Sequence, residues 1–362
     1  MFRAKTNCIE TYEYKKYFKA KHNIGLLDQW FKSETKLTTL IGVPLRGGIR
    51  DGIGTRDIDI DLENNSFFDL GDIIVNETMP FDEQINPKLL KIYRSFNNSD
   101  NNSDNNSDNN SDIEVVAPLS ILSRALSTLY HFYPNKRYLV FGDDQIIHYP
   151  SICECLDFYK KEFNTKIAVL YFSADLCNGD FLKREDIKNK NKNKNKNKNK
   201  NKNKNKNKNK NKKYLNLLVR NDNWMRLIAE NFIEANLLIN IGSIVFNKIN
   251  FEEDYSSESA TFAKGYSSSQ VSGIGISKVT ENVISYLKKK GVKYIYVAMD
   301  MNVIHLHSED GLPPHAPIAI LNELQEEFKL VAASITGFSN HQNEILSSTM
   351  VNSLINGLNK ND

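Results

Sequence analysis

The sequence has few cysteines and no long apolar run. Four cysteines in 362 residues are too few for a disulfide framework, and Cys153 and Cys155 lack the second pair that a structural zinc site needs. No run approaches the roughly 20 apolar residues of a membrane helix, and the first residues lack the apolar core of a signal peptide. We therefore expect a soluble, cytoplasmic protein with reduced thiols and no membrane partner.

Two tracts of the chain contain no apolar residue at all. Residues 97–112 repeat NNSD four times, and residues 188–213 alternate Lys and Asn almost without interruption. Because such segments have nothing to bury, each is predicted to be a disordered loop inserted between secondary-structure elements. We accordingly expect an N-terminal extension over residues 1–36 and a single domain over residues 37–358, interrupted by these two inserts.

The basic charge of the chain comes from one of these inserts. The whole sequence has 47 Lys and Arg against 44 Asp and Glu, but the Lys/Asn tract holds 14 of the lysines and the NNSD tract holds four of the aspartates. The remainder has 33 basic and 40 acidic residues, a net charge of about −7. A basic surface is not indicated, so we expect no nucleic-acid partner.

Short apolar runs alternate with longer amphipathic stretches through the rest of the chain. Strands are predicted at 37–43, 67–75, 137–141, 166–172, 237–246, 293–299 and 329–336, and helices at 115–132, 151–163, 214–235, 277–290, 317–328 and 341–358. Several of the strand runs are apolar throughout, which is typical of a parallel sheet buried on both faces. The pattern predicts an α/β fold of three layers, with a mostly parallel sheet of seven or eight strands.

Polar residues follow four of the predicted strands. In α/β folds of this kind, ligands bind at the carboxyl ends of the strands. The four segments are GDDQIIHYP (142–150), SADLCNGD (173–180), DMNVIH (300–305) and GFSNHQ (337–342).

The order and spacing of these segments resemble the ureohydrolases, the family of arginase, agmatinase and formiminoglutamase. The first segment resembles the family's GGDHSITYP-like loop, with its spacing to Tyr149-Pro150 intact. Further similar segments are GVPLRGG (42–48), FFDLGDI (67–73), NWMRLIAE (223–230), and DMNVI (300–304) followed by His315-Ala316-Pro317. The last two point to the formiminoglutamase branch. The resemblance implies an arginase-like α/β/α fold and a homo-oligomer, a trimer or a hexamer.

The resemblance also implies hydrolysis of linear amidine C–N bonds by a hydroxide held between two Mn²⁺ ions. The family's six metal ligands are a His, an Asp-x-His-x-Asp set and an Asp-x-Asp pair. The matching positions are Gln145, Ser173, Asp175, Cys177, Asp300 and Asn302. Only Asp300 keeps the ligand type, and the carboxylate charge falls from about −4 to about −2, too little to hold two dications together. We therefore expect the binuclear site to be lost and no cofactor to be bound.

Two interpretations of these residues remain open. Asp175, Cys177 and Asp300, with Asn302 or Gln145, could surround a single divalent ion such as Zn²⁺ or Fe²⁺. Alternatively, the two aspartates hydrogen-bond neighbouring backbone and hydroxyl groups, while the cysteine packs as a small apolar side chain. The family's late Glu, which would hold a guanidinium group, corresponds to Gly337 or its neighbour. The substrate clamp is therefore expected to be absent as well.

Three other features carry weaker signals. His148 is expected in the first turn of a helix, where the family carries Thr. His305 and His307, with Asp310, could form a metal site, but exposed loop histidines are the commoner case. The Ser-rich segment 255–270 is interpreted as a mobile loop or a phosphorylation target.

Three functions fit the sequence. The first is a formiminoglutamase-like pseudoenzyme that binds a small nitrogen-rich ligand or a protein partner, with no catalytic residue. The second is a divergent hydrolase of C–N bonds in amidine or formimino compounds that uses one metal. The third is a structural subunit of a hetero-oligomer with an active homologue.

Overall fold

The computed structural model describes residues 38–45, 67–73, 118–177, 224–234, 237–244, 264–304, 311–338 and 344–360. The predicted N-terminal extension (1–36), both low-complexity inserts (97–112 and 188–213) and the segment 305–310 with its two histidines lie outside the described residues. Within the described ranges, no helix has the length and apolar character to span a membrane.

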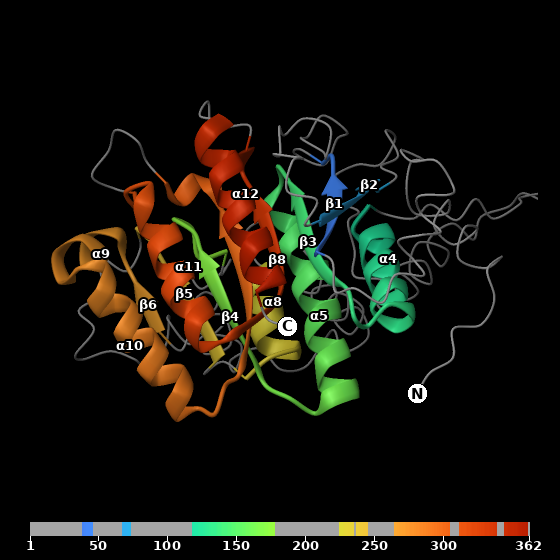
Figure 1. Ribbon diagram of the computed structural model, residues 1–362, viewed down its shortest axis with the longest axis horizontal. Coiled ribbons are helices and arrows are strands. Elements are labelled where there is room, and N and C mark those ends of the chain that lie inside the picture. Colours follow the sequence, from blue (N-terminus) through green and yellow to red (C-terminus); the bar gives the residue numbers. More distant parts are fainter. Residues whose placement is uncertain are drawn as a thin grey trace, which may run out of the picture.

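Eight strands form one sheet, in which every described pair of neighbours is parallel. They are β1 (Thr38–Val43), β2 (Phe67–Asp72), β3 (Arg137–Gly142), β4 (Ile167–Phe172), β5 (Leu238–Ile241), β6 (Lys264–Tyr266), β7 (Tyr294–Asp300) and β8 (Lys329–Thr336). Their order across the sheet is β2-β1-β3-β8-β7-β4-β5-β6 (Figure 1). The predicted parallel sheet of seven or eight strands is confirmed, and the three-residue strand β6 was not predicted.

The helices follow the predicted alternation. They are α4 (Pro118–Phe132), α5 (His148–Phe163), α8 (Trp224–Asn231), α9 (Ser268–Ile274), α10 (Ile276–Lys289), α11 (His315–Glu327) and α12 (Glu344–Asn359), with 3₁₀ turns η3 (Gln145–Ile147) and η7 (Met301–Val303). Helix α5 begins three residues earlier than predicted, because Pro150 is tolerated in a first turn, where a backbone N–H has no partner within the helix.

Different helices cover the two faces of the sheet. On β3, Tyr138 and Val140 pack into a core shared with α4, α5 and α8, whereas Leu139 and Phe141 face a core shared with α9 to α12. Figure 1 shows α9 to α12 gathered together in orange and red, and α4 and α5 side by side in green. Because both faces are covered, β4 is buried along its whole length and has no charged residue. The predicted three layers are confirmed.

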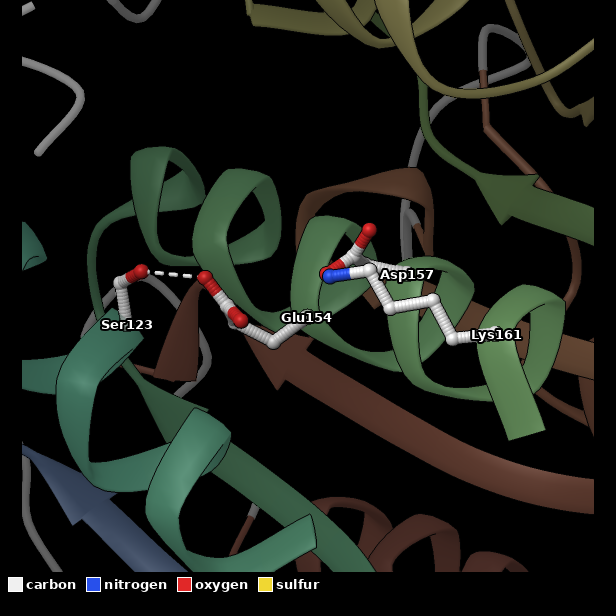
Figure 2. Close-up of polar contacts among 4 residues, drawn as sticks. All are labelled: Ser123, Glu154, Asp157 and Lys161. Carbon is white, nitrogen blue, oxygen red and sulfur yellow. Dashed lines mark hydrogen bonds and ion pairs between the residues drawn. The ribbon is translucent and has the colours of Figure 1, made fainter. Parts of the chain in front are cut away.

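Helix α5 leads away from the first strand-end loop, and a polar contact helps to hold it against α4. Figure 2 shows the hydroxyl of Ser123 on α4 donating to the carboxylate of Glu154 on α5. The same view shows an ion pair between Asp157 and Lys161, one turn apart on α5. Exposed pairs of this kind contribute only about 0.3–0.5 kcal/mol, so the position of α5 depends mainly on its buried contacts.

The described part of the Ser-rich segment is ordered secondary structure. Ser267 caps α9: its side chain accepts the backbone N–H of Gln270 at 3.1 Å, and the Gln270 side chain accepts the backbone N–H of Ser267 at 2.9 Å. Ser267 and Ser268 are buried. The interpretation as a mobile loop is therefore wrong for residues 264–270, where Ser-x-x-Gln is a capping box, and the interpretation as a phosphorylation target stays a prediction.

Gly242 provides a test of the packing at the end of β5. Its φ is +102°, and a Cβ atom there would lie 2.2 Å from Cγ2 of Val303. Gly242→Ala is expected to lower the free energy of unfolding by roughly 2–4 kcal/mol, from left-handed strain and overpacking combined. The control is Gly273→Ala in α9, where the added Cβ meets no atom within 4 Å. This variant should raise the free energy of unfolding by up to about 1 kcal/mol. Urea denaturation measures both, and equal effects would contradict this packing.

Candidate functional site

Four neighbouring strands bring the predicted site residues to one edge of the sheet. β3, β8, β7 and β4 are adjacent and parallel, so their carboxyl ends lie side by side. The residues that follow or end these strands are Gln145 after β3, Gly337 after β8, Asp300 and Asn302 at the end of β7, and Ser173, Asp175 and Cys177 after β4.

The carboxyl group of Asp300 lies at the centre of this site and is only 1% exposed. Its Oδ1 atom accepts the backbone N–H of Asn302 at 3.0 Å. Its Oδ2 atom accepts the side-chain amide of Gln145 and, at 3.4 Å, the hydroxyl of Ser173. Burial raises the pKa of Asp300 to about 7, although the hydrogen bonds from Asn302 and Ser173 act in the opposite direction. A full negative charge is therefore costly here at neutral pH.

Gln145 connects Asp300 to Cys177. While its amide nitrogen donates to Asp300, its amide oxygen accepts the thiol of Cys177 at 3.2 Å. The hydroxyl of Tyr171 lies 3.4 Å from the same sulfur. Burial raises the pKa of Cys177 to about 12, so the thiol stays protonated and acts as a donor. The backbone of Cys177 has φ +48°, a conformation uncommon for residues other than glycine.

The loop after β4 is fixed through Ser173. Its buried hydroxyl accepts the backbone N–H of Asp175 at 3.1 Å, and its carbonyl accepts the side-chain amide of Asn240 at 3.4 Å. Asp175 itself is exposed, whereas Cys177 and Asp300 are buried. The structure thus brings Gln145, Ser173, Cys177, Asp300 and Asn302 together and leaves the side chain of Asp175 at the surface.

Gly337 closes the site from the side of β8. Its backbone N–H donates to the carbonyl of Asp143 at 3.2 Å, and its φ is +82°. A Cβ atom at this position would lie 2.5 Å from Oδ1 of Asp300 and 2.9 Å from Nδ2 of Asn302. A glutamate at position 337 would therefore collide with the residues that it should accompany.

The donor set does not fit a pair of Mn²⁺ ions. Among the described residues, no three or more His, Cys, Asp or Glu side chains are grouped so that they could hold a metal ion. At the six ligand positions the strand ends offer one buried carboxyl group, one carboxyl group at the surface, a thiol, a hydroxyl and two amides, whereas Mn²⁺ prefers several carboxylates and imidazoles. As the second interpretation expects, Asp300 accepts a backbone N–H and a hydroxyl, but the amide of Gln145 and the hydrogen bond of Cys177 were not part of it. A single ion at Asp175, Cys177 and Asp300 would require the thiol to lose its proton and Gln145 to move.

A buried histidine network lies beside the site and was not predicted from the sequence. His148, the first residue of α5 as expected, has Nδ1 2.7 Å from the hydroxyl of Ser334 and Nε2 3.1 Å from the hydroxyl of Thr336. The hydroxyl of Tyr296 donates to Ser334 at 2.8 Å. Both ring nitrogens of His148 therefore have a hydroxyl partner, Ser334 at Nδ1 and Thr336 at Nε2. Burial lowers the pKa of His148 to about 3, so the ring is neutral.

Two aromatic rings enclose the imidazole. The centroid of the His148 ring lies 5.3 Å from that of Trp224 and 5.9 Å from that of Tyr171. Trp224 is fully buried and begins α8, so the segment that resembles the family's helix supplies one wall of this network. No spacing signal marks Ser334 or Thr336, because both lie inside an apolar strand run.

Comparisons with known proteins support the fold. No family model and no curated protein matches the sequence. Among solved structures, formimidoylglutamase from Bacillus subtilis matches with a TM-score of 0.53 and 14% identity over 90% of this chain and 87% of that chain. Proclavaminate amidino hydrolase from Streptomyces clavuligerus gives 0.52 and 13%, over 91% and 94%. Arginase from Bacillus subtilis gives 0.52 and 15%, over 90% and 99%. The chain therefore has the arginase-like fold of the ureohydrolases, as the resemblance implied.

The buried His148 predicts a distinctive pH dependence. Between pH 6.5 and about 3 the unfolded chain binds a proton at this residue and the folded chain does not, so stability falls as the pH falls. His148→Thr loses ring contacts and should be less stable than the parent at pH 8. The difference in free energy of unfolding between the parent and this variant should be about 2 kcal/mol smaller at pH 5 than at pH 8, because Thr does not titrate. Urea denaturation at both pH values measures this. A difference that stays constant would show that His148 is not held neutral.

Proposed function

We propose that this protein is a formiminoglutamase-like pseudoenzyme: a ureohydrolase-fold protein that has lost the binuclear manganese site and no longer catalyses hydrolysis. The observation that carries the proposal is the mutual satisfaction of the residues at the ligand positions. Gln145, Ser173 and Asn302 all donate to Asp300, and Cys177 donates to Gln145. Side chains that hydrogen-bond one another in this way have few lone pairs left for a cation.

Charge supports the same conclusion. Two dications about 3.5–4 Å apart repel by on the order of 15–20 kcal/mol at an effective dielectric constant of 20, so their ligands must supply several negative charges. Here the buried ligand positions hold a single carboxyl group, that of Asp300, and the thiol of Cys177. Asp175 adds a carboxylate only at the surface. The repulsion between the two ions would be left largely uncompensated.

The remaining role is binding. Asp143 and Asp144 follow β3 at the same edge of the sheet, and Asp144 accepts the backbone N–H of Ile146 at the start of η3. Asp143 and Asp144 are buried, so the exposed Asp175 is the carboxylate of this edge that a small cationic, nitrogen-rich ligand or a basic segment of a protein partner would meet. Such a ligand would be held without being hydrolysed.

Activity provides the direct test. The purified protein with excess Mn²⁺ is expected to hydrolyse neither arginine, agmatine nor formiminoglutamate at a rate typical of the family, because the loss of a metal ligand commonly costs orders of magnitude. Release of urea or formamide is measured alongside the Bacillus subtilis formimidoylglutamase as a positive control. Turnover that a chelator abolishes and Mn²⁺ restores would refute the proposal.

Restoring the ligands tests whether ligand chemistry, and not the backbone, is what has been lost. The repaired variant carries Gln145→His, Ser173→Asp, Asp175→His, Cys177→Asp and Asn302→Asp. It should bind Mn²⁺ in isothermal titration, and saturation to 100 times Kd should raise its free energy of unfolding by about 2.7 kcal/mol. The control adds Asp300→Asn and should bind more weakly.

Catalysis need not return in this variant, because Gly337 leaves no room for the family's substrate clamp. A repaired protein that is folded by circular dichroism and still takes up no Mn²⁺ would show that these strand ends do not superpose on the family's ligands.

A further inference from the structure

We propose that the side-chain amide of Gln145 connects the loops at the strand ends by hydrogen bonds, in place of a metal ion. This inference rests on the proposed function, since it explains what holds these loops together without metal. A cation shared by carboxylates would neutralise them and fix the loops that carry them. In this structure the loops after β3, β4 and β7 are joined instead by Gln145, through Cys177 on one side and Asp300 on the other.

The geometry gives the amide both of the roles that the site requires. Asp300 is almost completely buried, and an isolated carboxylate in a protein interior costs several kcal/mol unless donors surround it. The N–H of Gln145 places a partial positive charge against Oδ2. The buried thiol of Cys177 donates to the oxygen of the same amide at 3.2 Å, and the Tyr171 hydroxyl is its other polar neighbour, at 3.4 Å. A glutamate at position 145 would accept from Cys177 but could not donate to Asp300 when ionised.

The same contacts explain why the network is expected to be cooperative. Gln145 and Asp300 are 155 residues apart, and Ser173 and Asp300 are 127 apart, so each bond closes a long segment of chain. Removing one partner leaves a buried donor or acceptor unsatisfied on the other loop, which costs more than the bond itself contributes. The loops should therefore hold or lose their arrangement together.

An exchange of functional groups tests this arrangement with metal excluded by a chelator. Gln145→Glu alone places two carboxyl groups in contact, and Asp300→Asn alone places one amide donor against another. The double variant combines both substitutions and reverses the pair. The new amide at position 300 would donate to the new carboxylate at position 145, which still accepts from Cys177, and one carboxylate remains.

In urea denaturation, each single variant should lower the folding equilibrium constant at least about tenfold, the equivalent of 1.4 kcal/mol. The folding equilibrium constant of the double variant should be at least about tenfold higher than the value obtained by multiplying the two single effects. Ser173 loses its acceptor in the double variant, so recovery should be incomplete.

Two substitutions serve as matched controls. Gln270→Glu keeps the capping box of α9, because the side-chain oxygen still accepts the backbone N–H of Ser267, and stability should be unchanged. Asp157→Asn removes only the exposed pair with Lys161 and should also change little. If the double variant lowers the folding equilibrium constant by the product of the two single effects at Gln145 and Asp300, the inference is overturned.

If Gln145→Glu does not fold, a second cycle replaces the first. Gln145→Met keeps the length of the side chain without its polar atoms, and Cys177→Ala removes the donor that Gln145 accepts. Once Gln145 is replaced by Met, loss of the Cys177 thiol should cost measurably less than in the parent, and equal costs would overturn the inference. Both cycles measure stability without metal, so they can fail while the pseudoenzyme proposal stands, and Mn²⁺-dependent turnover would refute that proposal separately.

Discussion

The arrangement of the strand ends depends on the need to satisfy one buried carboxyl group, that of Asp300. Burial makes its charge expensive, as its raised pKa reflects, so donors must converge on it. They come from η3, from the loop after β4 and from the first residues of η7. Gly337 approaches from β8 so closely that no side chain fits there. Four loops from distant parts of the sequence are thereby fixed around a single group.

The fold and the chemistry of the site are separable in this molecule. Parallel strands bring the same loop positions to one edge whatever residues occupy them, so the arginase-like fold constrains where a site lies without specifying its reaction. Two cores of buried side chains, one on each face, hold the sheet. The network of His148 with Ser334 and Thr336 adds a second satisfied polar cluster next to the first. Both clusters hold strand ends in place through neutral or partly neutral groups.

The sequence predicted the sheet and the strand ends that carry the site residues, because uninterrupted apolar runs such as that of β4 have few alternatives to a buried parallel strand. It did not predict that the side chain of Asp175 lies at the surface, apart from the others. It did not predict β6 or α9, whose three and seven residues give too little periodicity to detect. Nor could it predict that Gln145 contacts Asp300 and Cys177 together, since the rotamer of an amide is set by packing between loops far apart in sequence. The partners of His148 were hidden for the same reason.

The most direct test of the account is anomalous diffraction from crystals grown with millimolar Mn²⁺ and measured near the manganese absorption edge. The account predicts no anomalous peak among Gln145, Ser173, Cys177, Asp300 and Asn302, and continuous density between the Gln145 amide and the Asp300 carboxyl group. Two peaks at these strand ends, with Gln145 displaced from Asp300, would contradict it.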